Sequence, residues 1–109
     1  MHRLFVYGTL APGRSNHHHL KSLDGEWTPA TLRGRLVAEG WGAAQGYPGI
    51  VPGGDGEAVS GWVLASPALC DHWARLDEFE GEGYERKVVT VTLANGTPVA
   101  AYVYALAPL

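Results

Sequence analysis

Glu80 is the residue whose type and position most suggest chemistry, because it stands at the end of a helix predicted to start at Pro67. At about 100° per residue, it continues an apolar stripe formed by Leu69, Trp73 and Leu76. Desolvation there, next to a helix C-terminus, would raise the pKa of the carboxyl. Such a glutamate suits general acid/base work near neutral pH. The helical phase alone leaves a second interpretation open, a last-turn glutamate that frays into water.

The first apolar stretch is a second candidate. Leu4 to Tyr7 predicts a short buried strand, and Gly8, Thr9 and Leu10 follow as a bend. Backbone N–H groups at a glycine bend can form a concave donor site for a carboxylate or an oxyanion. A plain first strand with a glycine turn is the simpler alternative.

Other candidates are aromatic and basic. Tyr47 lies on a proline-stiffened loop, where it would form a pocket wall or cover a core. Tyr84 and Arg86 share a strand face, and the arginine would orient a carboxylate or pair with a nearby acid. Tyr102 and Tyr104 also share a face, so their hydroxyls would enter a cavity or be satisfied within a core.

The three consecutive histidines His17, His18 and His19 do not indicate a metal site. Adjacent residues of a helix point about 100° apart, so the three rings would not converge on one ion. A surface helix capped by Ser15 or Asn16 is expected, with no metal and no other cofactor.

Strands and turns position these candidates. Gly34 predicts a bulge or a close backbone approach, Ser66-Pro67 predicts a helix start, and Asn95-Gly96 predicts a tight hairpin turn. Extended segments are expected at 26–39, 57–65, 84–93 and 99–105.

Composition limits the class of protein. A chain of 109 residues with 15 glycines and 7 prolines favours one small strand-rich domain over 1–109. A net charge of -3 argues against a nucleic-acid partner. The single cysteine, Cys70, indicates a reducing compartment. With neither a signal-peptide pattern nor a membrane-spanning segment in view, a cytoplasmic location and no membrane partner are expected.

The chain resembles the gamma-glutamylcyclotransferase-like family, in the short branch that includes the gamma-glutamylamine cyclotransferases. Three groups of residues carry the resemblance, in the order and spacing of the family. They are Phe5-Val6-Tyr7-Gly8-Thr9-Leu10 with Gly13 and Asn16; Gly34-Arg35-Leu36 with the stretch from Gly46 to Gly53; and Leu76-Asp77-Glu78-Phe79-Glu80-Gly81 with Tyr84-Glu85-Arg86 and Val89.

The resemblance implies an α+β fold, a small mixed β-barrel flanked by short helices, with a cavity at one end. It implies that Tyr7, Gly8, Thr9 and Leu10 bind a glutamyl head through backbone amides, and that Glu80 is the catalytic acid/base. Tyr47, Tyr84, Arg86 and Tyr102 complete our set of candidate substrate-binding residues. Val37 departs from the family, which often has an aromatic residue there, and this would alter the cavity wall.

The reaction implied is an intramolecular aminolysis of a gamma-glutamyl amine or peptide, which releases 5-oxoproline and the free amine. A non-catalytic binding module of the same fold is the alternative. A structural or interaction protein is a third interpretation, which rests only on aromatics such as Trp27 and Trp41. The leaving amine and the choice between a monomer and a weak homodimer are left open.

Overall fold

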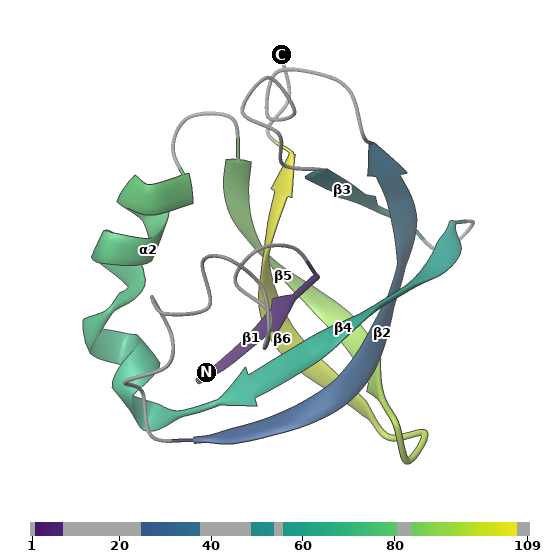
Figure 1. Cartoon of the computed structure of the whole chain (residues 1–109), viewed down its shortest axis with the longest axis horizontal. Coiled ribbons are helices and arrows are strands. Elements are labelled where there is room, and N and C mark those ends of the chain that lie inside the picture. Colours follow the sequence, from purple (N-terminus) through teal and green to yellow (C-terminus); the bar gives the residue numbers. More distant parts are fainter. Residues whose placement is uncertain (1, 8–24, 38–48, 54–55, 81–83, 107–109) are drawn as a thin grey trace.

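The structure, a computed structural model, describes residues 2–7, 25–37, 49–53, 56–80 and 84–106 (Figure 1). Of residues 36, 37, 79, 80 and 106 it describes the backbone only. No helix within these ranges is long and apolar enough to cross a membrane. The elements are β1 (Arg3–Val6), β2 (Glu26–Val37), β3 (Gly49–Pro52), β4 (Glu57–Ala65), η2 (Pro67–Asp71), α2 (Trp73–Glu80), β5 (Tyr84–Leu93) and β6 (Pro98–Leu106).

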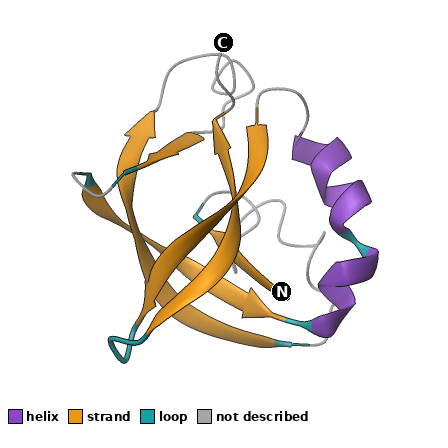
Figure 2. Ribbon diagram, turned by 180° about the vertical axis from the view of Figure 1, so that it is seen from behind, coloured by secondary structure: helices purple, strands orange, loops and turns teal. Residues whose placement is uncertain are grey.

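The strands close into a mixed barrel (Figure 2). Strand β4 pairs antiparallel with both β1 and β2, and β5 pairs antiparallel with both β2 and β6. A parallel pairing of β1 with β6 completes the ring. The short β3 bridges β2 and β6, and its Ile50 pairs with Ala105 of β6. This architecture confirms the small mixed barrel that the resemblance implies.

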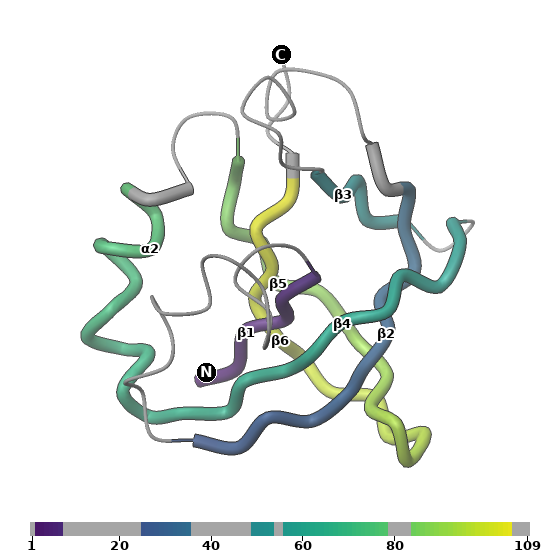
Figure 3. Tube along the Cα trace, in the orientation of Figure 1, coloured from purple at the N-terminus to yellow at the C-terminus, as the bar shows by residue number. Residues whose placement is uncertain are grey.

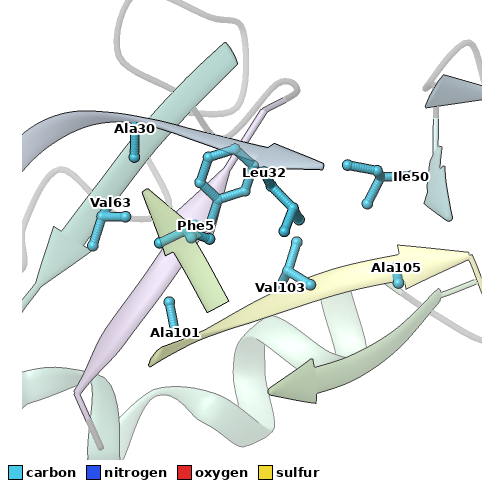
Figure 4. Close-up of a cluster of buried hydrophobic side chains, with 9 residues drawn as sticks. Phe5, Ala30, Leu32, Ile50, Val63, Ala101, Val103 and Ala105 are labelled. Atoms are coloured by element: carbon cyan, nitrogen blue, oxygen red, sulfur yellow. The ribbon is translucent and has the colours of Figure 1, made fainter. Parts of the chain in front are cut away.

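The inner faces of the strands fill the barrel with apolar side chains. Residues alternate between the two faces of a strand, so β1 sends Phe5 inward, while Leu4 and Val6 point outward. Figure 4 shows the inward side chains pointing toward one another between the strands. This inner cluster comprises Phe5, Ala30, Leu32, Ile50, Val63, Val91, Ala101, Val103 and Ala105.

A second cluster lies outside the barrel, where η2 and α2 run along it (Figure 1). It comprises Leu4, Val6, Leu64, Leu69, Leu76 and Tyr104. Leu69 comes from η2 and Leu76 from α2, and both are 0% exposed. The barrel wall therefore lies between two apolar layers, and the outer layer holds the helical segment in place.

The helical segment differs from its prediction in one respect. It is a 3-10 helix followed by a separate α-helix, with His72 between them at φ -117° and ψ -6°. The Ser66 side chain caps the first helix as expected, by accepting a hydrogen bond from the Ala68 N–H at 3.2 Å. A 3-10 helix has about three residues per turn, so the ideal α-helical angles do not apply across His72. The predicted apolar stripe is nevertheless confirmed, because Leu69 and Leu76 are buried in the outer cluster and Trp73 packs against it.

Within α2 the regular α-helical spacing applies. It places one further residue on the face predicted to hold Trp73, Leu76 and Glu80. Residues three or four positions apart share a face of a helix. In α2 this spacing relates Trp73, Leu76, Asp77 and Glu80. Glu78 lies off this face and is exposed, as predicted. The correction therefore adds Asp77, the residue that the sequence analysis left unassigned.

Two glycine predictions are confirmed. A Cβ at Gly34 would lie 2.8 Å from the carbonyl oxygen of Val51, so β2 and β3 approach closely there. Gly96 has φ 88°, a conformation that the turn between β5 and β6 requires and that L side chains rarely adopt. The Thr97 N–H donates to the Asn95 Oδ1 at 2.9 Å and closes the same turn.

Gly61 of β4 offers a test of the packing between strands. A Cβ there would lie 2.7 Å from Cζ of Phe5 and even closer to the carbonyl oxygen of Val6. We expect Gly61→Ala to lower the free energy of unfolding by about 1–3 kcal/mol, because backbone cannot move aside cheaply. Urea denaturation followed by tryptophan fluorescence measures it.

The matched control is Gly53→Ala, because a Cβ at Gly53 meets nothing within 4 Å. This variant should leave the free energy of unfolding unchanged or raise it slightly. Equal losses in the two variants would contradict the packing argument.

Candidate active site

Tyr104 of β6 is the junction of the candidate site. Its side chain is 5% exposed and packs in the outer cluster against Leu76 of α2. The phenol donates a hydrogen bond to Asp77 Oδ1 at 2.6 Å, and the backbone carbonyl accepts one from the Tyr7 hydroxyl at 2.7 Å. One residue therefore ties β6 both to α2 and to the end of β1.

Tyr7 follows β1 directly and packs against the inner cluster. Its hydroxyl donates to the Tyr104 carbonyl and accepts the Ile50 N–H at 3.0 Å. These bonds hold the end of β1 against β3 and β6. The side chain thus anchors the point from which the predicted loop Gly8–Leu10 departs.

Arg86 of β5 lies against α2. Its guanidinium carbon is 4.6 Å from the centroid of the Trp73 ring and 5.1 Å from that of Tyr102. Its Nε is 3.4 Å from Asp77 Oδ1. Of the two predicted roles, pairing with a nearby acid is the one the structure describes.

The ion pair and the aromatic contacts of Arg86 differ in how much they contribute to stability. The side chains of Arg86 and Asp77 are 27% and 44% exposed, so solvent screens their ion pair to about 0–1 kcal/mol. The arginine also packs on two aromatic rings, and cation–π contacts of this kind add about 0.5–1 kcal/mol or more. Arg86 therefore joins β5 to α2 as much by stacking as by charge.

The two tyrosines of β6 lie on its outer face, as the alternation predicted. They face α2 because the inward positions of β6 are occupied by Ala101, Val103 and Ala105. The Tyr102 ring meets Trp73 edge-on, with 5.0 Å between centroids. For Tyr104 the alternative of a core tyrosine with a satisfied hydroxyl is the correct one.

The remaining predicted residues are placed in part. Tyr84 begins β5 and packs, half-buried, against the outer cluster. Glu80 is the last residue of α2, although its side chain lies outside the described residues. Also outside them are Gly8, Thr9, Leu10, His17, His18, His19, Trp41 and Tyr47. The binding and catalytic roles assigned above stay predictions.

Asp77 is the residue that sequence reasoning missed. Two features of the sequence could have indicated Asp77. It stands four residues after Trp73 and three before Glu80. Its two partners, Arg86 and Tyr104, face each other across the hairpin. Arg86 of β5 pairs directly with Tyr104 of β6, in the register that the Asn95-Gly96 turn sets.

Comparisons with known proteins agree with this fold. The chain is 32% identical over 111 residues to the gamma-L-glutamyl-butirosin B gamma-glutamyl cyclotransferase of Niallia circulans, a match that covers 95% of this chain and 67% of the relative. The crystal structure of an AIG2-like protein from Mus musculus has a TM-score of 0.72 and 27% identity, covering 98% of this chain and 78% of that one.

A third match is to a much longer protein. YkqA from Bacillus subtilis has a TM-score of 0.72 and 32% identity over 95% of this chain, which spans only 35% of the length of YkqA. The family model described as gamma-glutamyl cyclotransferase, AIG2-like, matches residues 4–109. With a barrel of this architecture and a family match over nearly all of its length, the chain belongs to the AIG2-like gamma-glutamyl cyclotransferase family.

Proposed function

We propose that this protein is a gamma-glutamyl cyclotransferase that converts a small gamma-glutamyl amine or peptide into 5-oxoproline and the free amine. The observation that carries the proposal is the place of Glu80. It ends α2, three residues after Asp77 and four after Leu76, both of which contact the barrel. The family match and the name of the Niallia circulans relative support the same reaction class.

The proposed reaction transfers an acyl group within one molecule. Glu80 accepts a proton from the alpha-ammonium of the substrate, and the freed amine attacks the gamma carbonyl carbon. A new C–N bond closes a five-membered ring, and the carbonyl oxygen carries negative charge in the tetrahedral intermediate. When the original C–N bond breaks, Glu80 gives its proton to the leaving nitrogen, and the ring nitrogen loses its second proton to water as the lactam forms.

Holding the substrate folded is the main task of such a site, because amine and carbonyl already belong to the same molecule. The backbone amides of Gly8, Thr9 and Leu10 are our candidates for binding the head group and the developing oxyanion. The Tyr7 hydroxyl supports this assignment, because its two bonds to strand backbone hold in place the residue that directly precedes the loop.

Replacing the proposed acid/base tests the mechanism directly. We expect Glu80→Gln to retain the fold and ligand binding but to lower 5-oxoproline release by at least about 100-fold, since glutamine cannot carry the proton. The assay measures release from a panel of gamma-glutamyl amines and dipeptides. Glu78→Gln is the matched control, an exposed carboxylate of the same helix, and should retain full turnover.

The outcomes separate the alternatives. Full turnover in Glu80→Gln would overturn the mechanism while leaving the reaction class in place. No release by the parent protein from any member of the panel would favour the non-catalytic binding module.

Tyr7→Phe tests the anchor of the loop. The variant removes one hydroxyl and leaves the Ile50 N–H and the Tyr104 carbonyl without it, so we expect the free energy of unfolding to fall by about 1–3 kcal/mol. The KM for the best substrate should rise, because the loop starts from a less ordered strand end. Chemical denaturation and steady-state kinetics measure the two effects.

For stability, Tyr102→Phe is the matched control, since its ring packs on Trp73 and no described hydrogen bond uses its hydroxyl. It should change the free energy of unfolding by less than about 0.5 kcal/mol. A Tyr7→Phe variant as stable as the parent would show that the hydroxyl does not anchor the strand end.

A further inference from the structure

We propose that Asp77 is a positioning residue: clamped by Tyr104 and Arg86, it fixes the last turn of α2 and thereby the direction of Glu80. This inference rests on the proposed function, in which Glu80 is the acid/base. The clamp joins α2 to both strands of the hairpin, through the phenol of Tyr104 and the guanidinium of Arg86.

The hydrogen bond from Tyr104 is the firm part of the clamp. At 2.6 Å from phenol to carboxylate oxygen it is short, as is typical of an O–H donor on a charged acceptor. The phenol is held rigidly because the ring is 5% exposed within the outer cluster. A buried phenol also needs a partner, so losing the bond costs stability on the side of Tyr104. The Asp77 side chain is 44% exposed, and its carboxylate can bond to water instead.

The clamp supplies what the apolar contact of α2 lacks. Leu76 is fully buried and Trp73 packs edge-on against Tyr102, so these two side chains hold the start and middle of the helix against the barrel. Hydrophobic contacts have little directional preference, and neither reaches the last turn. A hydrogen bond weakens steeply away from its preferred angle, so Asp77 adds a directional constraint on the rotation of the helix nearer to its last turn.

Arg86 is the second partner of Asp77, and its Nε lies 3.4 Å from the same Oδ1 that accepts the Tyr104 hydrogen bond. Its guanidinium spans Trp73 and Asp77, one helical turn apart, so β5 holds α2 along its length and not at a single point. Asp77 is also the last residue of α2 whose side-chain contact with the barrel is described.

Glu80 follows Asp77 by three residues, the spacing of neighbours on a helix surface. A rotation or fraying of the last turn would therefore displace Glu80. Because the carbonyl of Tyr104 also holds Tyr7, the same residue is tied to the proposed acid/base helix and to the start of the proposed amide loop. The clamp thus sets the two halves of the proposed site relative to each other.

Double-mutant kinetics test the clamp. We expect Tyr104→Phe and Asp77→Ala each to lower kcat by about 10- to 100-fold with KM changed less than about twofold, the effect of a misplaced group and not of lost binding. The double variant should be no slower than the slower single variant. Asp77→Asn keeps an acceptor for the phenol and should recover part of kcat, and Glu78→Gln is the control with unchanged kcat.

Hydrogen exchange supplies a readout that does not depend on turnover. Amides at the end of α2 should exchange faster in Tyr104→Phe and Asp77→Ala than in the parent, while those of η2 should not change. Unchanged exchange at the end of α2 would overturn the clamp.

The two proposals fail in different ways. One outcome is that Tyr104→Phe and Asp77→Ala keep the kcat of the parent while Glu80→Gln is inactive. It would overturn the positioning role of Asp77 but not the proposed function. If the parent releases no 5-oxoproline, the proposed function fails, and with it the catalytic meaning of the clamp. Additive losses in the double variant would show two separate structural effects and would also overturn the inference.

Discussion

The hydrogen bond between Tyr104 and Asp77 is the contact on which the placement of α2 depends. The helix is short, and its apolar contacts, made by Leu76 and Trp73, hold it against the barrel with little directional preference. The directional bond to a buried phenol adds a constraint on its orientation. Arg86 adds a cationic contact that reaches from the same carboxylate to the ring of Trp73.

This arrangement is possible because β1 and β6 each serve two apolar layers. Phe5 and Val103 point into the barrel, whereas Leu4, Val6 and Tyr104 point outward beneath the helices. Burying a large apolar side chain stabilises a fold by about 1.5–3 kcal/mol, so a chain of this size gains from using both faces of a strand. The parallel pairing of β1 with β6 brings the two strands side by side (Figure 3).

Three tyrosines make contacts that hold the strands and the helix together. The hydroxyls of Tyr7 and Tyr104 hold strand backbone and helix in place, and Tyr102 packs against Trp73. The proposed chemistry needs no phenol: a carboxylate moves the proton, and backbone amides bind the glutamyl head. The described contacts of Tyr7 and Tyr104 are therefore structural, and the proposed mechanism assigns the proton transfer to Glu80.

Local sequence determined much of the fold. The alternation in Tyr84–Leu93 and Pro98–Leu106 correctly sorted their side chains into two faces, because residues of a strand alternate strictly. Asn95-Gly96 and Ser66-Pro67 marked a turn and a helix start, because each depends on a few neighbouring residues. The motifs of the resemblance pointed to the family that the comparisons confirmed.

Only the tertiary structure decided which element each face of a strand or helix packs against. Periodicity puts Tyr102 and Tyr104 on one side of a strand, but the barrel closure decides that this side lies under α2. The sequence pattern did not show the change from a 3-10 helix to an α-helix at His72, although Leu69, Trp73 and Leu76 still pack in the same outer cluster. Asp77 meets Tyr104 and Arg86 across 27 and 9 positions of sequence, and no local pattern specifies a contact between a helix and two strands. Such contacts depend on packing the whole chain, which is why the sequence indicated Glu80 but not the residue that holds its helix in place.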